Sequence, residues 1–254
     1  MGSTAMIYNY VKILNIPFSC CSFFEILQRM EEAIKEKEKG NYICITNTES
    51  AFHATRIKSH LNYIQNSAFS CCDGIGVVIA GKIFGYNIPR LNGPDLMLKC
   101  CEYGVTKNWR HYFYGGKKEI PALLSKNLIH RYPKLVIAGS FSPPFRDLTF
   151  REKNEILKDI NDSDADIIWV GLGLLKQENW ISENIKKINA SWLIGVGAAF
   201  DFHAGTIKRA PRFYRTIGIE WLYRLVFEPR MFIRNLYSFY LLLFAIKEKL
   251  YRKH

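Results

Sequence analysis

The chain has 254 residues, a formal net charge of +12, 48% hydrophobic residues and 23% charged residues. This length and composition fit one large globular domain, or one such domain with an appendage. An apolar run near the C-terminus, Leu236–Ile246, is 11 residues long, whereas a helix that spans a bilayer needs about 20. This run is therefore not a transmembrane helix.

The charge is distributed unevenly. Residues 206–254 contain 11 Lys and Arg against 3 Asp and Glu, whereas residues 1–205 contain 24 against 20. We therefore predict a nearly neutral body, residues 1–205, and a basic appendage, residues 206–254. Such an appendage favours a polyanionic partner, which can be nucleic acid, anionic lipid or a diphosphate. Because the sequence contains no recognised nucleic-acid motif, a nucleic-acid-binding protein is kept only as an alternative, and no nucleic-acid partner is expected.

The cysteines favour neither disulfides nor a zinc site. There are seven, an odd number, and six of them form the adjacent pairs Cys20-Cys21, Cys71-Cys72 and Cys100-Cys101, with no CxxC spacing. We expect buried, reduced thiols in a cytoplasmic protein.

Predicted strands and helices alternate along the chain, because short apolar runs alternate with segments whose apolar residues recur at helical spacing. The predicted strands are Tyr42–Ile45, Ala68–Cys72, His111–Tyr114, Leu135–Gly139, Ile167–Gly173 and Trp192–Gly197, and the predicted helices are Ser22–Lys37, Pro94–Tyr103, Phe150–Ile160 and Lys176–Ile188, with one following the 73–76 turn and another ending at Arg131. This order predicts an α/β fold with a mainly parallel sheet flanked by helices.

Several turns of this predicted sheet are rich in glycine. Their backbone N–H groups can hold phosphate, but simple turn chemistry is an alternative explanation, since none is a complete GxGxxG or Walker motif. A dehydrogenase-like nucleotide enzyme would have GxGxxG after its first strand, which here ends in Thr46-Asn47-Thr48-Glu49. That class is kept as an alternative.

Asp73 follows the second strand and precedes the Gly74-Ile75-Gly76 turn. The carboxyl ends of strands are where open α/β sheets bind ligands, and the two glycines allow close approach of a ligand. A catalytic role and a helix-capping role both fit this position.

Aromatic residues, leucines and basic residues mix in the last segment of the chain. Leu236–Ile246 is apolar and aromatic, with Arg and Lys on both sides. This pattern is typical of a helix that lies in the membrane interface. The alternative is that the same residues pack on the sheet domain or on another subunit.

Short motifs in a fixed order give the chain a resemblance to the WecG/TagA/CpsF glycosyltransferases (glycosyltransferase family 26), from about Tyr42 to Arg234. The motifs are Thr46-Asn47, Asp73–Val78, Arg90–Leu96, Tyr114–Gly116, Val170–Trp180, Gly195–Asp201, Arg209–Pro211, Glu220–Arg224 and Glu228–Arg230. Two positions depart from the family pattern: Leu175 replaces a usual proline, and Ala198 replaces a frequent glycine.

The resemblance implies an inverting glycosyltransferase with a Rossmann-like fold, bound peripherally to the cytoplasmic face of the cell membrane. Such enzymes move N-acetylmannosamine, glucose or a related sugar from a UDP-sugar to a polyprenyl-diphosphate-linked sugar during cell-surface polysaccharide synthesis. It also implies that the C-terminal appendage meets the membrane and completes the site.

Inverting transfer needs a base for the acceptor hydroxyl, and Asp73 is the candidate. Thr46 and Asn47 end the neighbouring strand and are candidates for holding the donor. Gln177 is a candidate contact for the donor or the acceptor. Arg90 is a further candidate, although a surface position is an alternative for it.

The departing UDP needs positive charge nearby, and many transferases supply it with a metal bound by a DxD pair. Asp164-Ala165-Asp166 has that pattern but precedes a strand, so we predict it at the opposite end of the sheet. We therefore expect no metal and no cofactor. The expected cations are Arg215, Arg224 and Arg230, which can hold a diphosphate or, alternatively, lipid headgroups.

Overall fold

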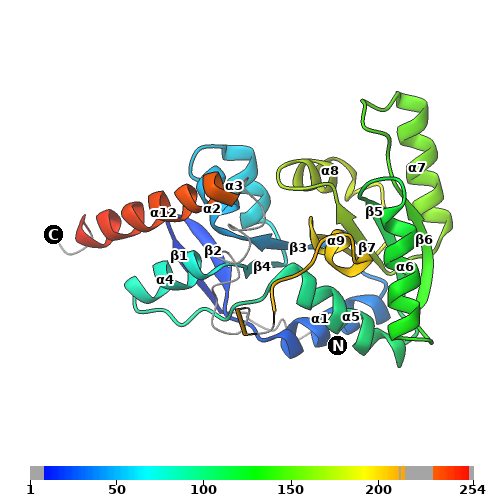
Figure 1. The fold of residues 1–254 in the computed structure, drawn as a ribbon, viewed down its shortest axis with the longest axis horizontal. Coiled ribbons are helices and arrows are strands. Elements are labelled where there is room, and N and C mark those ends of the chain that lie inside the picture. Colours follow the sequence, from blue (N-terminus) through cyan, green and yellow to red (C-terminus); the bar gives the residue numbers. More distant parts are fainter. Residues whose placement is uncertain (1–8, 212, 215–230, 252–254) are drawn as a thin grey trace.

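The computed structural model describes residues 9–211, 213–214 and 231–251 (Figure 1). Its centre is a six-stranded, fully parallel sheet with the strand order β4-β3-β8-β7-β5-β6. The strands are β3 (Asn41–Thr46), β4 (Phe69–Cys72), β5 (Arg110–Gly115), β6 (Val136–Phe141), β7 (Ile167–Gly171) and β8 (Trp192–Gly195). All six predicted strands are thus present, and the predicted α/β class with a mainly parallel sheet is confirmed.

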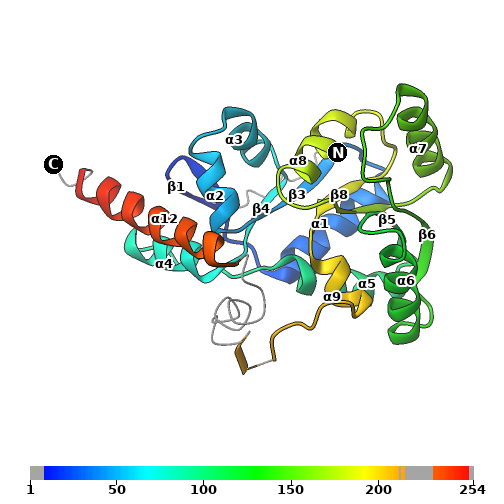
Figure 2. The ribbon, with the colours of Figure 1, turned by 45° about the horizontal axis from the view of Figure 1, so that its top comes forward.

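Helices cover both faces of the sheet (Figures 1 and 2). They are α1 (Phe23–Lys35), α2 (Thr48–Ala54), α3 (Lys58–Gln65), α4 (Ile75–Ile83), α5 (Gly93–Val105), α6 (Ile120–Arg131), α7 (Phe150–Asp162), α8 (Lys176–Asn184), α9 (Ala199–Ala204) and α12 (Met231–Tyr251). One core joins the sheet to α1, α5, α6 and α9, and a second core joins it to α2, α3, α4, α7, α8 and α12. The result is a three-layer, Rossmann-like sandwich.

The apolar strand runs are continuous because both of their faces are buried. In β7, Ile167 and Trp169 belong to one core and Ile168 and Val170 to the other, and all four are fully buried. Successive side chains of a strand point to opposite faces, so a strand between two helical layers must be apolar at every position.

An N-terminal hairpin was not predicted. Strands β1 (Tyr10–Ile13) and β2 (Ile16–Ser19) pair antiparallel, and β2 packs beside β4. Their two-residue turn, Leu14 and Asn15, has φ values of 52° and 63°. Tight hairpin turns need such positive φ values and usually have Asn-Gly or Asp-Gly there, so Leu-Asn gave no signal. Helix α9 was also missed.

The C-terminal helix α12 packs on the sheet domain. It lies against α2 and α4 in both views (Figures 1 and 2), with Leu241 and Ala245 buried. The sequence left open whether this segment packs on the sheet domain or lies in the membrane interface. The face that carries Leu241 and Ala245 packs on the sheet domain. The division of the chain at residue 205 stays a prediction. No helix in the described ranges combines the length and the apolar character that a bilayer span requires.

Candidate active site

A cavity of about 830 Å³ opens at the carboxyl ends of β3, β4, β7 and β8. Adjacent parallel strands end there, which is where this fold class binds ligands. Its walls come from seven regions: Ile45, Asn47, Thr48 and Glu49; Asp73, Gly74, Ile75, Gly76 and Ile79; Arg90, Asn92, Gly93 and Pro94; Gly173, Leu174 and Gln177; Gly195–Ala199 and Phe202; Arg209; and Ser238 and Leu242.

Asp73 lies on the cavity wall directly after β4. Its backbone N–H donates to the Thr46 carbonyl oxygen at 3.0 Å, which extends the β3–β4 pairing by one step. Helix α4 begins at N-cap Gly74, which has φ of 121°, and has no side-chain capping bond. The N-cap position of α4 therefore belongs to Gly74, and Asp73 lies one residue before it. A φ of that size favours glycine, so the turn after Asp73 depends on Gly74.

The two candidates at the end of β3 have different positions. Asn47 lines the cavity and caps α2, with its Oδ1 accepting from Ser50 N at 2.9 Å. Thr46 is fully buried, and its hydroxyl lies 3.1 Å from the Ser70 hydroxyl and 3.4 Å from the Cys44 thiol. The structure therefore does not bring Thr46 into the cavity.

Gln177 lies in the first turn of α8 and lines the cavity, although only 6% of it is exposed. Its Oε1 accepts from the Gly197 backbone N–H at 3.0 Å, and its Nε2 donates to Glu178 Oε1 at 3.1 Å. Both ends of the amide are therefore held.

Arg90 also reaches the cavity wall, so the alternative of a plain surface arginine does not describe it. It forms a parallel bridge with Cys72 at the end of β4, and Leu91 N donates to the Cys72 carbonyl oxygen at 2.8 Å. This bridge places the Arg90 backbone beside the end of β4, and the guanidinium group of an arginine that lines the cavity is suited to bind phosphate.

A polar cluster on the cavity wall was not predicted from the sequence. Arg209 donates to Asp95 Oδ1 at 2.5 Å and to Asn92 Oδ1 at 3.0 Å. Asn92 is the N-cap of α5 and Asp95 lies three residues later. The Asn-x-x-Asp spacing indicates a helix start, but nothing local in the sequence connects it to Arg209.

The three predicted C-terminal cations, Arg215, Arg224 and Arg230, lie outside the described residues. The appendage does reach the site, because Ser238 and Leu242 of α12 line the cavity. This contact fits the expectation that the appendage contributes to the site.

The Asp164-Ala165-Asp166 segment lies where the sequence predicted, before β7 and at the opposite end of the sheet. Asp166 accepts a hydrogen bond from the Arg110 backbone at 2.8 Å, so it joins β5 to β7. Burial raises the pKa of Asp166. In the described ranges, no group of three or more His, Cys, Asp or Glu side chains is arranged to hold a metal ion.

All seven cysteines are free thiols, and six are buried. Cys72 is next to Asp73, and burial raises the pKa of its thiol well above the ordinary value, so a thiolate is not available there. Of the two side chains at the end of β4, Cys72 and Asp73, the carboxylate of Asp73 is therefore the one suited to accept a proton.

The sequence has relatives of known activity. The profile of the "Glycosyl transferase WecG/TagA/CpsF family" matches residues 11–254. A Bacillus subtilis protein named N-acetylglucosaminyldiphosphoundecaprenol N-acetyl-beta-D-mannosaminyltransferase is 28% identical over 218 residues, covering 85% of this chain and 83% of the relative. Proteins of the same name from Bacillus spizizenii and Staphylococcus aureus are 29% and 27% identical, over 83% and 86% of this chain and 80% and 85% of the relatives. The chain therefore belongs to the WecG/TagA/CpsF family and is a glycosyltransferase.

Proposed function

We propose that the protein transfers N-acetylmannosamine or a related sugar from a UDP-sugar to a polyprenyl-diphosphate-linked N-acetylglucosamine, with inversion and without a metal ion, in cell-surface polysaccharide biosynthesis. The names of the three relatives support this donor sugar and this acceptor. The observation that carries the proposal is the position of Asp73, a carboxylate on the wall of a large cavity at the carboxyl ends of the strands.

In the proposed reaction, Asp73 takes the proton of the acceptor hydroxyl while that oxygen attacks the anomeric carbon of the donor sugar. The bond from that carbon to the UDP oxygen breaks, and UDP leaves with the bonding electrons. Attack from the side opposite to UDP inverts the anomeric centre. A positioned base of this kind contributes about 10²–10⁴-fold to the rate.

The cavity offers polar groups for the donor. Arg90 supplies positive charge on the same cavity wall as Asp73, while Asn47 and Gln177 supply amide groups from the start of α2 and the first turn of α8. A guanidinium binds a diphosphate with paired hydrogen bonds, so we assign Arg90 to the leaving diphosphate. Arg215, Arg224 and Arg230 are proposed as additional cations.

We assign the membrane contact to the outer face of α12. Leu241 and Ala245 are buried against the domain, whereas the rest of the helix exposes the apolar and aromatic side chains of Leu236, Phe239, Tyr240, Leu243, Phe244, Ile246, Leu250 and Tyr251. An exposed apolar stripe on a helix with a basic flank is suited to a membrane interface. Binding at the cytoplasmic face would bring the cavity, which α12 also lines, to a lipid-linked acceptor.

The test is a transfer assay with a panel of UDP-sugars, polyprenyl-diphosphate-linked N-acetylglucosamine and vesicles. We expect Asp73→Asn to lower kcat/KM by about 10²–10⁴-fold, and EDTA to leave the wild-type rate unchanged. Asp162→Asn, an exposed change on α7, is the matched control. Full activity in Asp73→Asn would refute the assignment of the base, and loss of activity in EDTA would refute metal independence.

A further inference from the structure

Gln177 is held by two neighbours whose chemistry agrees on one orientation of its amide. A backbone N–H such as that of Gly197 can only donate, so it requires the oxygen end of the amide at 3.0 Å. Burial raises the pKa of the Glu178 carboxyl. With or without a proton on Oε2, its Oε1 accepts, so it requires the nitrogen end of the Gln177 amide at 3.1 Å. If the amide were flipped, its NH₂ group would face the Gly197 N–H, donor against donor. Its oxygen would face Glu178 Oε1, acceptor against acceptor.

Glu178 is an unusual residue to find at this position if its role were only to stabilise the fold. It is 3% exposed, and its Oε2 is a buried atom with no hydrogen-bond partner in the described part of the chain. Leaving a carboxyl oxygen in that state destabilises a protein. An apolar residue of similar volume would avoid this penalty, so the carboxylate needs another explanation.

The space around the Gln177 amide is tight. A Cβ added at Gly195, the last residue of β8, would lie 2.9 Å from both Cδ and Nε2 of Gln177. The amide therefore lies directly against the backbone of β8, and Gly197, which it binds, belongs to the turn that lines the cavity. Its orientation has to be set by Glu178 and Gly197 together, because they bind its two ends.

We propose that Glu178 is a positioning residue that acts through Gln177. Its carboxylate fixes the amide so that Oε1 holds the Gly197 turn and one Nε2–H stays available for an oxygen atom of the donor, either a sugar hydroxyl or a phosphate. The assignment of that ligand rests on the proposed function. The positioning itself rests only on the contacts of Gln177.

The structural test uses Glu178→Gln, with Glu183→Gln as the matched control, because Glu183 is an exposed residue of the same helix. In Glu178→Gln the side chain at 178 can present either an oxygen or an NH₂ group to Gln177, so only the Gly197 N–H still requires one orientation of the amide. We expect the Gln177 side-chain NH₂ signals in ¹⁵N NMR to shift, and hydrogen exchange of the Gly197 N–H to accelerate at least tenfold. Both should stay as in the wild type in Glu183→Gln. Unchanged signals and exchange in Glu178→Gln would overturn the proposal.

The kinetic test is a double-mutant cycle in the transfer assay. If Glu178 acts through Gln177, Glu178→Gln should lower kcat/KM for the donor at least tenfold, and should lower it no further when Gln177 is already Ala. If Glu178 contributed only to stability, the losses in kcat/KM of the two single variants would multiply in the double variant. Gly195→Ala is a second variant that leaves Glu178 in place but displaces the amide, so it should also lower kcat/KM.

Exchanging the two side chains separates stability from function. In Gln177→Glu/Glu178→Gln, a carboxylate at 177 accepts from both the Gly197 N–H and the new amide, so the melting temperature should return to that of the wild type. The carboxylate has no N–H for the substrate, so activity should stay low. Restored activity would overturn the proposal.

The structural test and the kinetic test also distinguish a failure of this proposal from a failure of the proposed function. A wild type that transfers sugar while Glu178→Gln behaves like Glu183→Gln in both tests would overturn the positioning role and leave the function intact. A wild type that transfers no sugar, with the Gln177 and Gly197 signals altered in Glu178→Gln, would refute the function and support the positioning role.

Discussion

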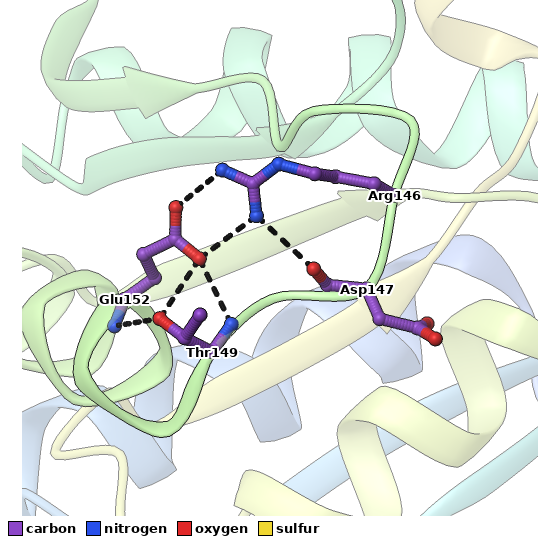
Figure 3. A network of polar contacts seen from close by, with 4 residues as sticks. All are labelled: Arg146, Asp147, Thr149 and Glu152. Carbon is purple, nitrogen blue, oxygen red and sulfur yellow. Dashed lines mark hydrogen bonds and ion pairs between the residues drawn. The ribbon is translucent and has the colours of Figure 1, made fainter.

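Two arginine–carboxylate clusters in this protein share nearly the same chemistry. Each is built on the start of a helix, where an N-cap residue and an acid three positions later bind each other: Asn92 with Asp95 at α5, and Thr149 with Glu152 at α7. In each, an arginine binds the acid. Arg146 donates to Glu152 at 2.6 and 2.9 Å (Figure 3), and Arg209 donates to Asp95 at 2.5 Å.

The clusters differ in burial and in the length of chain that they close. Arg146 lies six residues before Glu152, and its side chain is 57% exposed. Arg209 lies 114 residues after Asp95, and its side chain is 13% exposed. The first cluster therefore shapes one local loop. The second ties the segment after α9 to the start of α5, on the wall of the cavity, so the same contacts have a larger structural consequence there.

The largest effect is expected from Arg209→Ala. It leaves the Asp95 carboxylate partly buried without this arginine and releases the segment after α9, so we expect a loss of about 2 kcal/mol in the free energy of unfolding. Because Arg209 lines the cavity, kcat/KM should also fall, by tenfold or more. Urea denaturation and the transfer assay measure the two effects. If Arg209→Ala were as stable and as active as Arg146→Ala, burial would not distinguish the two clusters.

A smaller effect is expected from removing the N-cap residues. Asn92→Ala removes the α5 cap and one acceptor of Arg209, so the unfolding free energy should fall by about 1–2 kcal/mol. Thr149→Ala removes the α7 cap, which is exposed, and should lower it by about 0.5–1 kcal/mol. Only Asn92→Ala should reduce transfer activity. Equal effects on activity would contradict the distinction between a local cluster and one that shapes the cavity.

The contrast also explains what the sequence allowed us to predict. Buried strands such as Ile167–Gly171 could be recognised, because burial on both faces requires a continuous apolar run. Asp73 could be placed, because the carboxyl ends of parallel strands meet at one edge of the sheet. The contact of Arg209 with Asp95 could not, because no local pattern relates residues 114 positions apart.

Thr46 shows a different limit of sequence reasoning. It was grouped with Asn47 because both end a strand, but Thr46 is still the last residue of β3 and its side chain still obeys the alternation of the pleat. It is therefore buried against Ser70, whereas Asn47, one position later, reaches the cavity. A one-residue difference in where the strand ends decides which of the two side chains lines the cavity.

The smallest effect on stability is expected from Arg146→Ala, because exposed ion pairs contribute little. The change should instead be visible in the titration of Glu152, whose pKa is lowered from 4.5 to about 2, mainly by hydrogen bonds from Arg146 and then by those from Thr149. A lowered pKa means that the stabilisation is present above the ordinary value of 4.5 and is lost as the pH falls toward 2. In Arg146→Ala the pKa of Glu152, followed by NMR of its side-chain carboxyl, should rise toward 4.5, with the remaining depression due to Thr149. An unchanged pKa would mean that the α7 cap alone holds the carboxylate, and that the arginine in this cluster, unlike Arg209 in the other, contributes nothing to it.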